Sequence, residues 1–592
     1  MSEQLSRTWD LDSIFPGGSG SSEFAAFLVE LAADIPAVAA KLDEAHPTDA
    51  TAWRARIDEL QDLAQRLRHA GAFVSCLAAQ DVHDHQARAL SAKSRQLYAD
   101  FASVLTRLDS MLVAIEPTDW QQLLASDQLR PLAFVLDERR RRAAQMLPPE
   151  QETLVNDLSV DGYHGWSDLY DLTTGRMTIE FEHGGEQHSM SPGQAANRMS
   201  DPDPELRSAL LSAWESAWSG QAEYCALALN HLAGFRLNLY RSRGWDSALR
   251  EPLDINRMQS GTLDAMWQAI ERRKEPLQEY LAIKQRMLGL DRLNWADLDA
   301  PVGRTDTLLS YEAAAAFITE QFGRFDPALA ELAQRAFAER WIESEDRPGK
   351  RMGGFCTSFP GVRQSRIFVT FSGTMGNLAT LAHELGHAYH QHVMNDMEPL
   401  NQQYAMNVAE TASTFAEMIV SDAALRAATD PAERLVLVED RLRRATALLM
   451  NIQCRFLFET RFYEERRQGT VGVARLNELM VEAQREAYRD SLGVYHPTFW
   501  ASKLHFYHTR VPFYNFPYTF GYLFSAGVYA KALSSGPGFA ARYADLLRDT
   551  GRMNVEELAA THLEADLTSE AFWGLALDGL LEDVAELRAL TG

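Results

Sequence analysis

The sequence lacks the long apolar runs that place a chain in a membrane or direct it out of the cell. No stretch of about 18 apolar residues occurs among its 592 residues, which argues against a transmembrane helix. The opening segment MSEQLSRTWDLDSIF carries charges throughout and has no apolar core, so it does not fit a secretory signal. We therefore expect a cytoplasmic protein with no membrane partner.

Cysteine is equally scarce. The four thiols are scattered without CxxC spacing, which predicts neither a disulfide framework nor a thiolate zinc site. They are expected to be reduced in the cytosol, and they are Cys76, Cys225, Cys356 and Cys454.

Basic residues are fewer than acidic ones, with 57 Lys and Arg against 82 Asp and Glu. The formal net charge is −25, which repels phosphate backbones and anionic head groups, so we expect no nucleic acid partner. Hydrophobic residues make up 46% and charged residues 23%, as in folded globular proteins. The length predicts more than one lobe, and nothing in the composition indicates an oligomeric state.

Helical periodicity dominates, so the predicted fold class is mainly α. Two β elements interrupt it: a hairpin within residues 177–190, around a Gly-Gly pair, and a strand over residues 366–371. The Pro- and Gly-containing stretch RPGKRMGGF breaks the helical pattern before that strand. We divide the chain into an N-terminal helical lobe with the hairpin (1–191), a connecting helical region (192–345) and a catalytic lobe (346–592).

The central motif is TLAHELGHAYH, which contains HExxH as His383, Glu384 and His387. Two histidines four apart on a helix are separated by about 6 Å of rise, so both imidazoles can reach one metal ion. Glu384 follows the first histidine and can take a proton from water beside that ion. The pattern predicts a zinc site with Glu384 as general base, the alternative being an exposed helix with two solvated histidines.

A catalytic zinc site needs a third protein ligand and an open position. His390 is about 10.5 Å along the helix from His383, too far for one ion, so we expect it in an outer shell or at the surface. The next predicted helix, residues 404–425, offers Glu410 and Glu417. Glu410 is favoured because small residues flank it and permit close approach of the metal helix, and Glu417 could orient a ligand histidine.

Glycines precede the predicted strand. Gly353 and Gly354 could let a substrate backbone approach in an extended form, although an ordinary turn would explain them as well. Cys356 could be a redox-sensitive neighbour, but a buried inert thiol is the simpler interpretation.

A stretch dense in aromatics, LHFYHTRVPFYNFPYTFGYLFS, covers residues 504–525. Pro517 can open a helix, from which Tyr518 and Tyr522 project on one face. Phenol or imidazole donors stabilise the oxyanion that forms during peptide hydrolysis, and core packing is the alternative role for such tyrosines. The phenylalanines are expected in the core: Phe513, Phe516, Phe520 and Phe524.

In these motifs the sequence resembles the thimet oligopeptidase and oligoendopeptidase F family of metallopeptidases. GKRMGGFC, RIFVTFSGT, TLAHELGHAYH and AETASTFAEM occur in the family's order within residues 349–525, and TWDLDSIFP is similar to the start of the oligoendopeptidase F branch. The resemblance implies two helical lobes around a deep substrate channel. It also implies one zinc ion per chain, held by His383, His387 and Glu410, and endopeptidase cleavage of oligopeptides with Glu384 as base.

The same resemblance assigns transition-state donors to a histidine and tyrosines of the aromatic stretch. It implies His505, Tyr514 and Tyr522 as catalytic donors, and Tyr518 and His508 as substrate-binding residues, with His508 an alternative to His505. Three other functions stay open: a zinc carboxypeptidase or dipeptidase of similar fold, an inactive peptide-binding protein, and a purely structural metal site.

Overall fold

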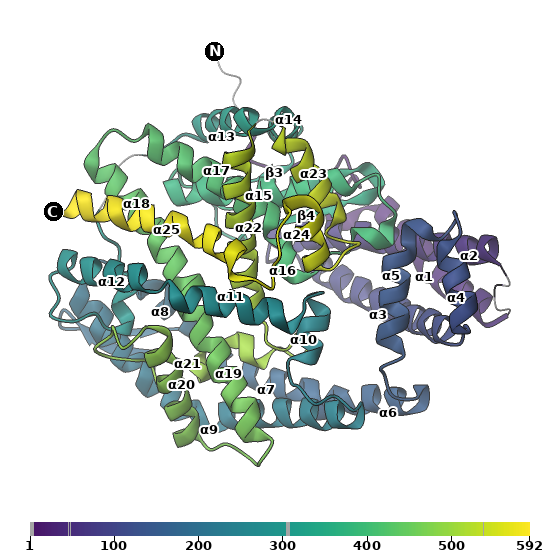
Figure 1. Cartoon of the computed structure of the whole chain (residues 1–592), viewed down its shortest axis with the longest axis horizontal. Helices are drawn as coiled ribbons and strands as arrows, with labels where there is room; N and C mark the ends of the chain where they lie inside the picture. The colour runs from purple at the N-terminus through teal and green to yellow at the C-terminus, as the bar shows by residue number, and fades with distance from the viewer. Residues whose placement is uncertain (1–4, 45–46, 48, 304–307, 537) are drawn as a thin grey trace. The chain divides into compact units, whose positions relative to one another are not determined.

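The computed structural model describes residues 5–44, 47, 49–303, 308–536 and 538–592 (Figure 1). Helices make up most of these residues, and the described strands form one two-stranded and one three-stranded sheet. The predicted fold class, mainly α with small β elements, is confirmed.

The chain divides into two compact units, each assembled from three separate stretches. Unit 1 comprises residues 1–145, 307–423 and 528–565, and unit 2 comprises residues 146–306, 424–527 and 566–592. The division of the sequence into three consecutive lobes stays a prediction.

Unit 1 begins with helices whose apolar spacing sets their buried face. In α1 (Ser22–Glu44), Phe24, Leu28, Leu31 and Ile35 recur at helical spacing and are all buried. Each such side chain contributes about 1.5–3 kcal/mol through burial. The other long helices of this unit are α2 (Ala50–Gln80), α3 (His85–Val113), α4 (Pro117–Ala125), α5 (Ala133–Ala143), α13 (Tyr311–Phe325), α14 (Pro327–Ala338), α15 (Met375–Met394), α17 (Thr411–Ala427, which continues into unit 2), α23 (Phe539–Asp549) and α24 (Val555–Leu563).

The three-stranded sheet of unit 1 has the order β3-β5-β4. β3 (Ile342–Glu343) pairs in parallel with β5 (Gln364–Phe368), and β4 (Phe355–Phe359) pairs antiparallel with β5. The strand predicted at 366–371 therefore starts two residues earlier and ends at Phe368. β4 lies at the sheet edge, and no other described strand pairs with its outer side.

Unit 2 contains the predicted hairpin. β1 (Ile179–His183) pairs antiparallel with β2 (Glu186–Met190). Gly184 and Gly185 connect them with φ of 60° and 81°, a conformation that favours glycine and suits a two-residue hairpin turn.

The helices of unit 2 include the longest of the described part of the chain, α9 (Pro204–Ser242). The others are α6 (Pro149–Ser159), α7 (Gly165–Gly175), α8 (Pro192–Arg198), α10 (Arg250–Ile255), α11 (Ser260–Arg272), α12 (Glu275–Met287), α18 (Pro431–Thr446), α19 (Ile452–Arg466), α20 (Val473–Ala487), α21 (Phe499–Ser502), α22 (Phe516–Ser535, which continues into unit 1) and α25 (Glu570–Thr591).

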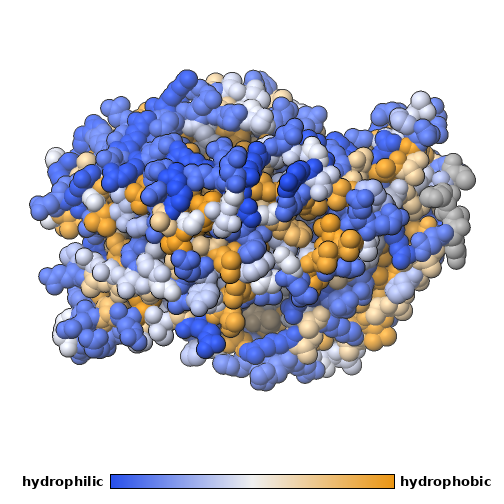
Figure 2. Space-filling model, turned by 90° about the horizontal axis from the view of Figure 1, so that it is seen from below, coloured by the Kyte–Doolittle hydropathy of each residue, from blue (hydrophilic) through white to orange (hydrophobic). Residues whose placement is uncertain are grey.

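Figure 2 shows one face of the molecule, on which hydrophilic residues predominate and hydrophobic side chains form smaller patches between them. Among the described residues, every helix falls short of the length or the apolar character that crossing a bilayer requires.

Candidate metal centre and peptide-binding cavity

The HExxH segment lies in α15, and capping hydrogen bonds between neighbouring residues determine where this helix begins. The Thr374 side chain accepts a hydrogen bond from the backbone N–H of Asn377, and the Asn377 side chain caps the Thr374 N–H in return. From this start, His383 and His387 lie one turn apart on one face, with ring centroids 4.9 Å apart. The helix thus presents two imidazoles to the same point.

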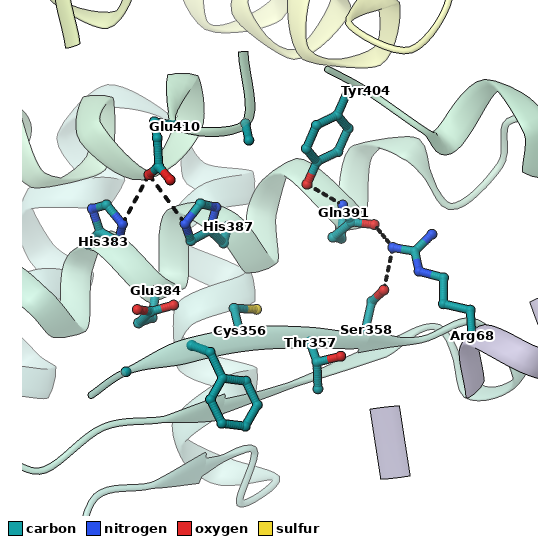
Figure 3. Close-up of a pocket in the computed structure, with 13 residues that line it drawn as sticks. Arg68, Cys356, Thr357, Ser358, His383, Glu384, His387, Gln391, Tyr404 and Glu410 are labelled. Atoms are coloured by element: carbon teal, nitrogen blue, oxygen red, sulfur yellow. Dashed lines mark hydrogen bonds and ion pairs between the residues drawn. The ribbon is translucent and has the colours of Figure 1, made fainter. Parts of the chain in front are cut away.

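Glu410 joins them from the turn between α16 (Met406–Ala409) and α17. Its Oε2 lies 3.2 Å from His383 Nε2 and 3.5 Å from His387 Nε2 (Figure 3). Ser413 Oγ donates to the same oxygen at 2.8 Å. The helix predicted as continuous over 404–425 is therefore interrupted at Glu410, whose backbone (φ −83°, ψ 1°) departs from helical geometry and turns its side chain to the histidines.

These three residues form a group whose ligand atoms all lie within 4.8 Å of one another. Ligands about 2.1 Å from a tetrahedral zinc ion are about 3.4 Å from each other. The separations of Glu410 Oε2 from the two imidazole nitrogens match that spacing. Two imidazoles and a carboxylate also suit zinc chemically and leave one position open.

Glu417 lies behind the cluster on α17. Its Oε2 is 3.3 Å from His383 Nδ1, the ring nitrogen that points away from Glu410. A carboxylate in this position fixes the tautomer and orientation of a ligand histidine.

We predict that Glu417→Gln lowers metal affinity about tenfold, at the lower end of the effect of outer-shell partners, because the amide oxygen can still accept from Nδ1. Competition with a chromophoric chelator measures this affinity, and an unchanged value would show that Glu417 does not support the ligand.

Glu384 is only 6% exposed, and its Oε2 has no hydrogen-bond partner among the described residues. Burial raises its pKa to about 7, opposed by His383 and assisted by Glu410. A Cβ at Gly354 would lie 3.1 Å from Glu384 Oε1, so only glycine leaves room here without displacing a neighbour. The carboxylate is therefore held beside the cluster, with one oxygen available for a proton.

The electrostatics of the cluster favour an ionised Glu410 beside a neutral His387. Burial acts to raise the pKa of Glu410, but its hydrogen bond with His383 and its electrostatic interactions with both imidazoles outweigh burial and lower that pKa to about 2. Burial lowers the pKa of His387 to about 4. A carboxylate and neutral imidazoles are the protonation states that metal ligands need.

A cavity of about 470 Å³ opens on the cluster. Both His383 and His387 line it, together with Glu384, Glu410 and four residues of β4, from Phe355 to Ser358 (Figure 3). Cys356 on that strand is only partly buried, so the expected buried thiol is wrong in that detail. Burial and the nearby Glu384 raise the pKa of its thiol well above its usual range, which keeps it protonated.

The two glycines before β4 have different roles. Gly353 has a φ of 91°, so the chain turns there in a conformation that favours glycine. Gly354 lines the cavity. The turn interpretation thus fits Gly353, and the approach of a substrate backbone at Gly354 stays a prediction.

The cavity also contains residues that the motifs did not reveal, namely Arg68, Ser358, Gln391 and Tyr404. Gln391 follows His387 by four positions, so its place on the metal-binding face could have been inferred from helical spacing. Arg68 comes from α2, more than 300 positions before Gln391, and no local pattern links them.

His390 lies outside the cluster. It is fully buried, with Nε2 2.8 Å from Thr550 Oγ1 and its ring stacked on Tyr404 at 4.1 Å. Of the two expected positions, an outer shell or the surface, the surface is wrong, because α23 covers this face of α15.

The aromatic stretch lies in unit 2, and four of its rings form one group. His508 and Tyr514 lie 4.7 Å apart between centroids, and His505 and Tyr514 lie 5.4 Å apart. Tyr518 is 5.8 Å from Tyr514. Burial, with Arg455, Lys503 and His508, lowers the pKa of His505 to about 4. The group offers neutral imidazoles beside phenols.

Tyr522 differs from these rings. It lies one helical turn after Tyr518 on α22, and its charged neighbours are Asp583, Arg441 and Arg444. Burial raises its pKa to about 12, so it can donate a proton in a hydrogen bond. The four phenylalanines assigned to the core are buried as predicted: Phe513, Phe516, Phe520 and Phe524.

Comparison with known protein families places this geometry in context. The sequence model of peptidase family M3 matches residues 198–573, which are more than half of the chain. The chain belongs to peptidase family M3. Residues 112–179 also match the description of oligopeptidase F, so the family resemblance seen in the motifs is confirmed. As an M3 member the protein is a metallopeptidase.

This M3 peptidase has relatives along nearly its full length. It is 24% identical to the group B oligopeptidase PepB of Streptococcus agalactiae over 98% of this chain and 96% of the relative. Its fold matches a crystal structure of a Chlamydophila abortus protein (TM-score 0.84, 19% identity, 99% and 98% coverage of this chain and that one). It also matches oligoendopeptidase-F from Enterococcus faecium (TM-score 0.70, 17% identity, 96% and 98% coverage).

Proposed function

We propose that this M3 peptidase is a zinc-dependent endopeptidase that hydrolyses internal bonds of oligopeptides. The proposal rests above all on one observation: the ligand atoms of His383, His387 and Glu410 lie within 4.8 Å of one another, and Glu384 lines the same cavity. Three protein ligands suit a catalytic metal rather than a structural one, which takes four. The names of the relatives, oligopeptidase and oligoendopeptidase, support oligopeptides as substrates.

The ligand set fits zinc in chemistry and in spacing. When bound, the ion supplies Lewis-acid chemistry, polarising a carbonyl group and making water acidic enough to ionise near neutral pH.

Glu384 is the proton carrier in this proposal. It accepts a proton from the attacking water as the C–O bond forms, and it gives that proton to the amine nitrogen as the C–N bond breaks. Its buried Oε2, which has no hydrogen-bond partner among the residues that the structure describes, and its pKa near 7 suit both steps. The outer edge of β4 would hold the peptide in an extended form, and Gly354 would let the peptide backbone approach Glu384.

Donors for the oxyanion are proposed from the aromatic stretch. His505, Tyr514 and Tyr522 are the candidates for hydrogen bonding to the developing charge, and Tyr518 and His508 for substrate binding. The support is that four of these rings lie together and that His505 and Tyr522 have pKa values that keep both neutral.

The test is digestion of an unlabelled decapeptide by the metal-loaded chain, with product masses determined over time. Internal cuts are expected. Sequential loss of single residues or dipeptides from the C-terminus would support a carboxypeptidase instead, and binding without turnover would indicate a peptide-binding protein.

Metal removal gives a separate prediction. Dialysis against a strong chelator is expected to abolish cleavage, and one equivalent of Zn²⁺ per chain is expected to restore it. Metal content and activity are measured on the same samples. Full cleavage by a sample shown to be metal-free would contradict the proposed chemistry.

A further inference from the structure

Arg68 lines the cavity and forms no ion pair with any carboxylate of the described residues. It is partly buried on α2 and donates from Nη2 to Ser358 Oγ and Gln391 Oε1 (Figure 3). Its Nη1 donates to Gln402 Oε1 at 3.3 Å. All three acceptors are neutral. Arg68 has no ion pair with any described residue.

Two other arginines of α2, unlike Arg68, form ion pairs with carboxylates. Arg54 is paired with Asp58 and Glu398, and Arg66 with Asp34 at 2.7 Å. Hydrogen bonding to Asp58 raises the pKa of Arg54, whereas burial without a carboxylate lowers the pKa of Arg68. Burial disfavours the charged form of this guanidinium, and an anion that enters the cavity would stabilise that form by pairing with it.

The position of Arg68 relative to the metal centre follows from two elements. Gln391, its partner on α15, is one turn or about 6 Å beyond His387. Along β4, Ser358 is four positions or about 13 Å from Gly354, the residue beside Glu384. A peptide lying along the edge of β4 therefore reaches Arg68 about two to four residues from the bond that is cut.

We propose that Arg68 binds a carboxylate of the peptide substrate, about two to four residues from the scissile bond, and so selects where the peptide is cut. This inference rests on the proposed endopeptidase function. The carboxylate can be the C-terminus of the peptide or the side chain of Asp or Glu, because a planar guanidinium pairs with both in the same way.

The experiment uses pairs of peptides that differ in one carboxylate. One pair has a free or an amidated C-terminus, and the others exchange Glu for Gln at each of four positions on either side of the cut. Metal-loaded wild type is expected to prefer the carboxylate member of one pair by about 10- to 100-fold in kcat/KM, the range for a hydrogen bond to a charged group. The pair that responds identifies the source of the carboxylate.

Arg68→Gln is expected to reduce that preference to less than about twofold, since an amide forms no ion pair. Taking the ratio of two substrates within one variant cancels any loss of active protein. Arg66→Gln is the matched control, because Arg66 is already paired with Asp34, and it should keep the wild-type ratio. Arg68→Glu is expected to reverse the charge preference, so that a peptide with Lys at the same position is cut faster than the peptide with the carboxylate.

Two results would overturn the inference: no carboxylate preference in wild type, which needs no variant to observe, or a preference that survives unchanged in Arg68→Gln. Failure of the metal-loaded wild type to cut any peptide would instead refute the proposed function, and this inference with it.

Discussion

Glu384→Gln is expected to lower kcat by about 10²- to 10⁴-fold, the contribution of a positioned general base. The amide has the shape of the carboxylate but cannot carry a proton between water and the leaving amine. The substitution should fit, because Glu384 Oε2 has no hydrogen-bond partner to lose among the described residues. Metal content should stay at the wild-type level, since the proposed ligands are His383, His387 and Glu410.

Turnover and metal per chain are measured on the same preparation. Glu320→Gln serves as the control, because Glu320 is exposed on α13 and pairs only with Arg324 among the described residues. It should leave kcat unchanged. If Glu384→Gln kept kcat within tenfold of wild type with full metal content, another group would have to be the base.

The grouping of His383, His387 and Glu410 was predictable in part, because two of its three members lie one helical turn apart. The spacing of His383 and His387 along a helix determines their geometry, and the small residues around Glu410 permit the close approach that brings it to them. The interruption of the helix at Glu410 was not predictable in the same way. Apolar spacing continues through it, and nothing in that spacing marks the position at which the backbone departs from helical geometry.

Features that depend on distant contacts lay beyond the sequence patterns. Arg68 and Gln391 meet across more than 300 positions, and His390 is buried because Thr550 lies against it. The two units were not predicted for the same reason, since each combines stretches that lie far apart in the chain. Periodicity reports which face of a helix is apolar, but not which distant element covers it.

Gly386 stands between the two ligand histidines, where α17 meets α15. A Cβ there would lie 2.5 Å from Ala412 O and 2.6 Å from Ser413 Cα. These are backbone atoms, so no rotamer change can relieve the clash, and the start of α17 must move. Ser413 Oγ donates a hydrogen bond to Glu410 Oε2, so movement of α17 also displaces the proposed third ligand.

We therefore expect Gly386→Ala to cost about 1–3 kcal/mol of unfolding free energy and to weaken metal binding by about 10- to 100-fold. Thermal unfolding with and without metal, together with chelator competition, measures both. Gly376→Ala is the matched control on the same helix, because its nearest neighbour would be Thr374 Oγ1 at 3.8 Å. It should keep wild-type metal affinity and lose no stability, since alanine favours a helix over glycine by about 0.5–1 kcal/mol. If Gly386→Ala matched this control in both measurements, the tight crossing of α15 and α17 would not be what positions Glu410.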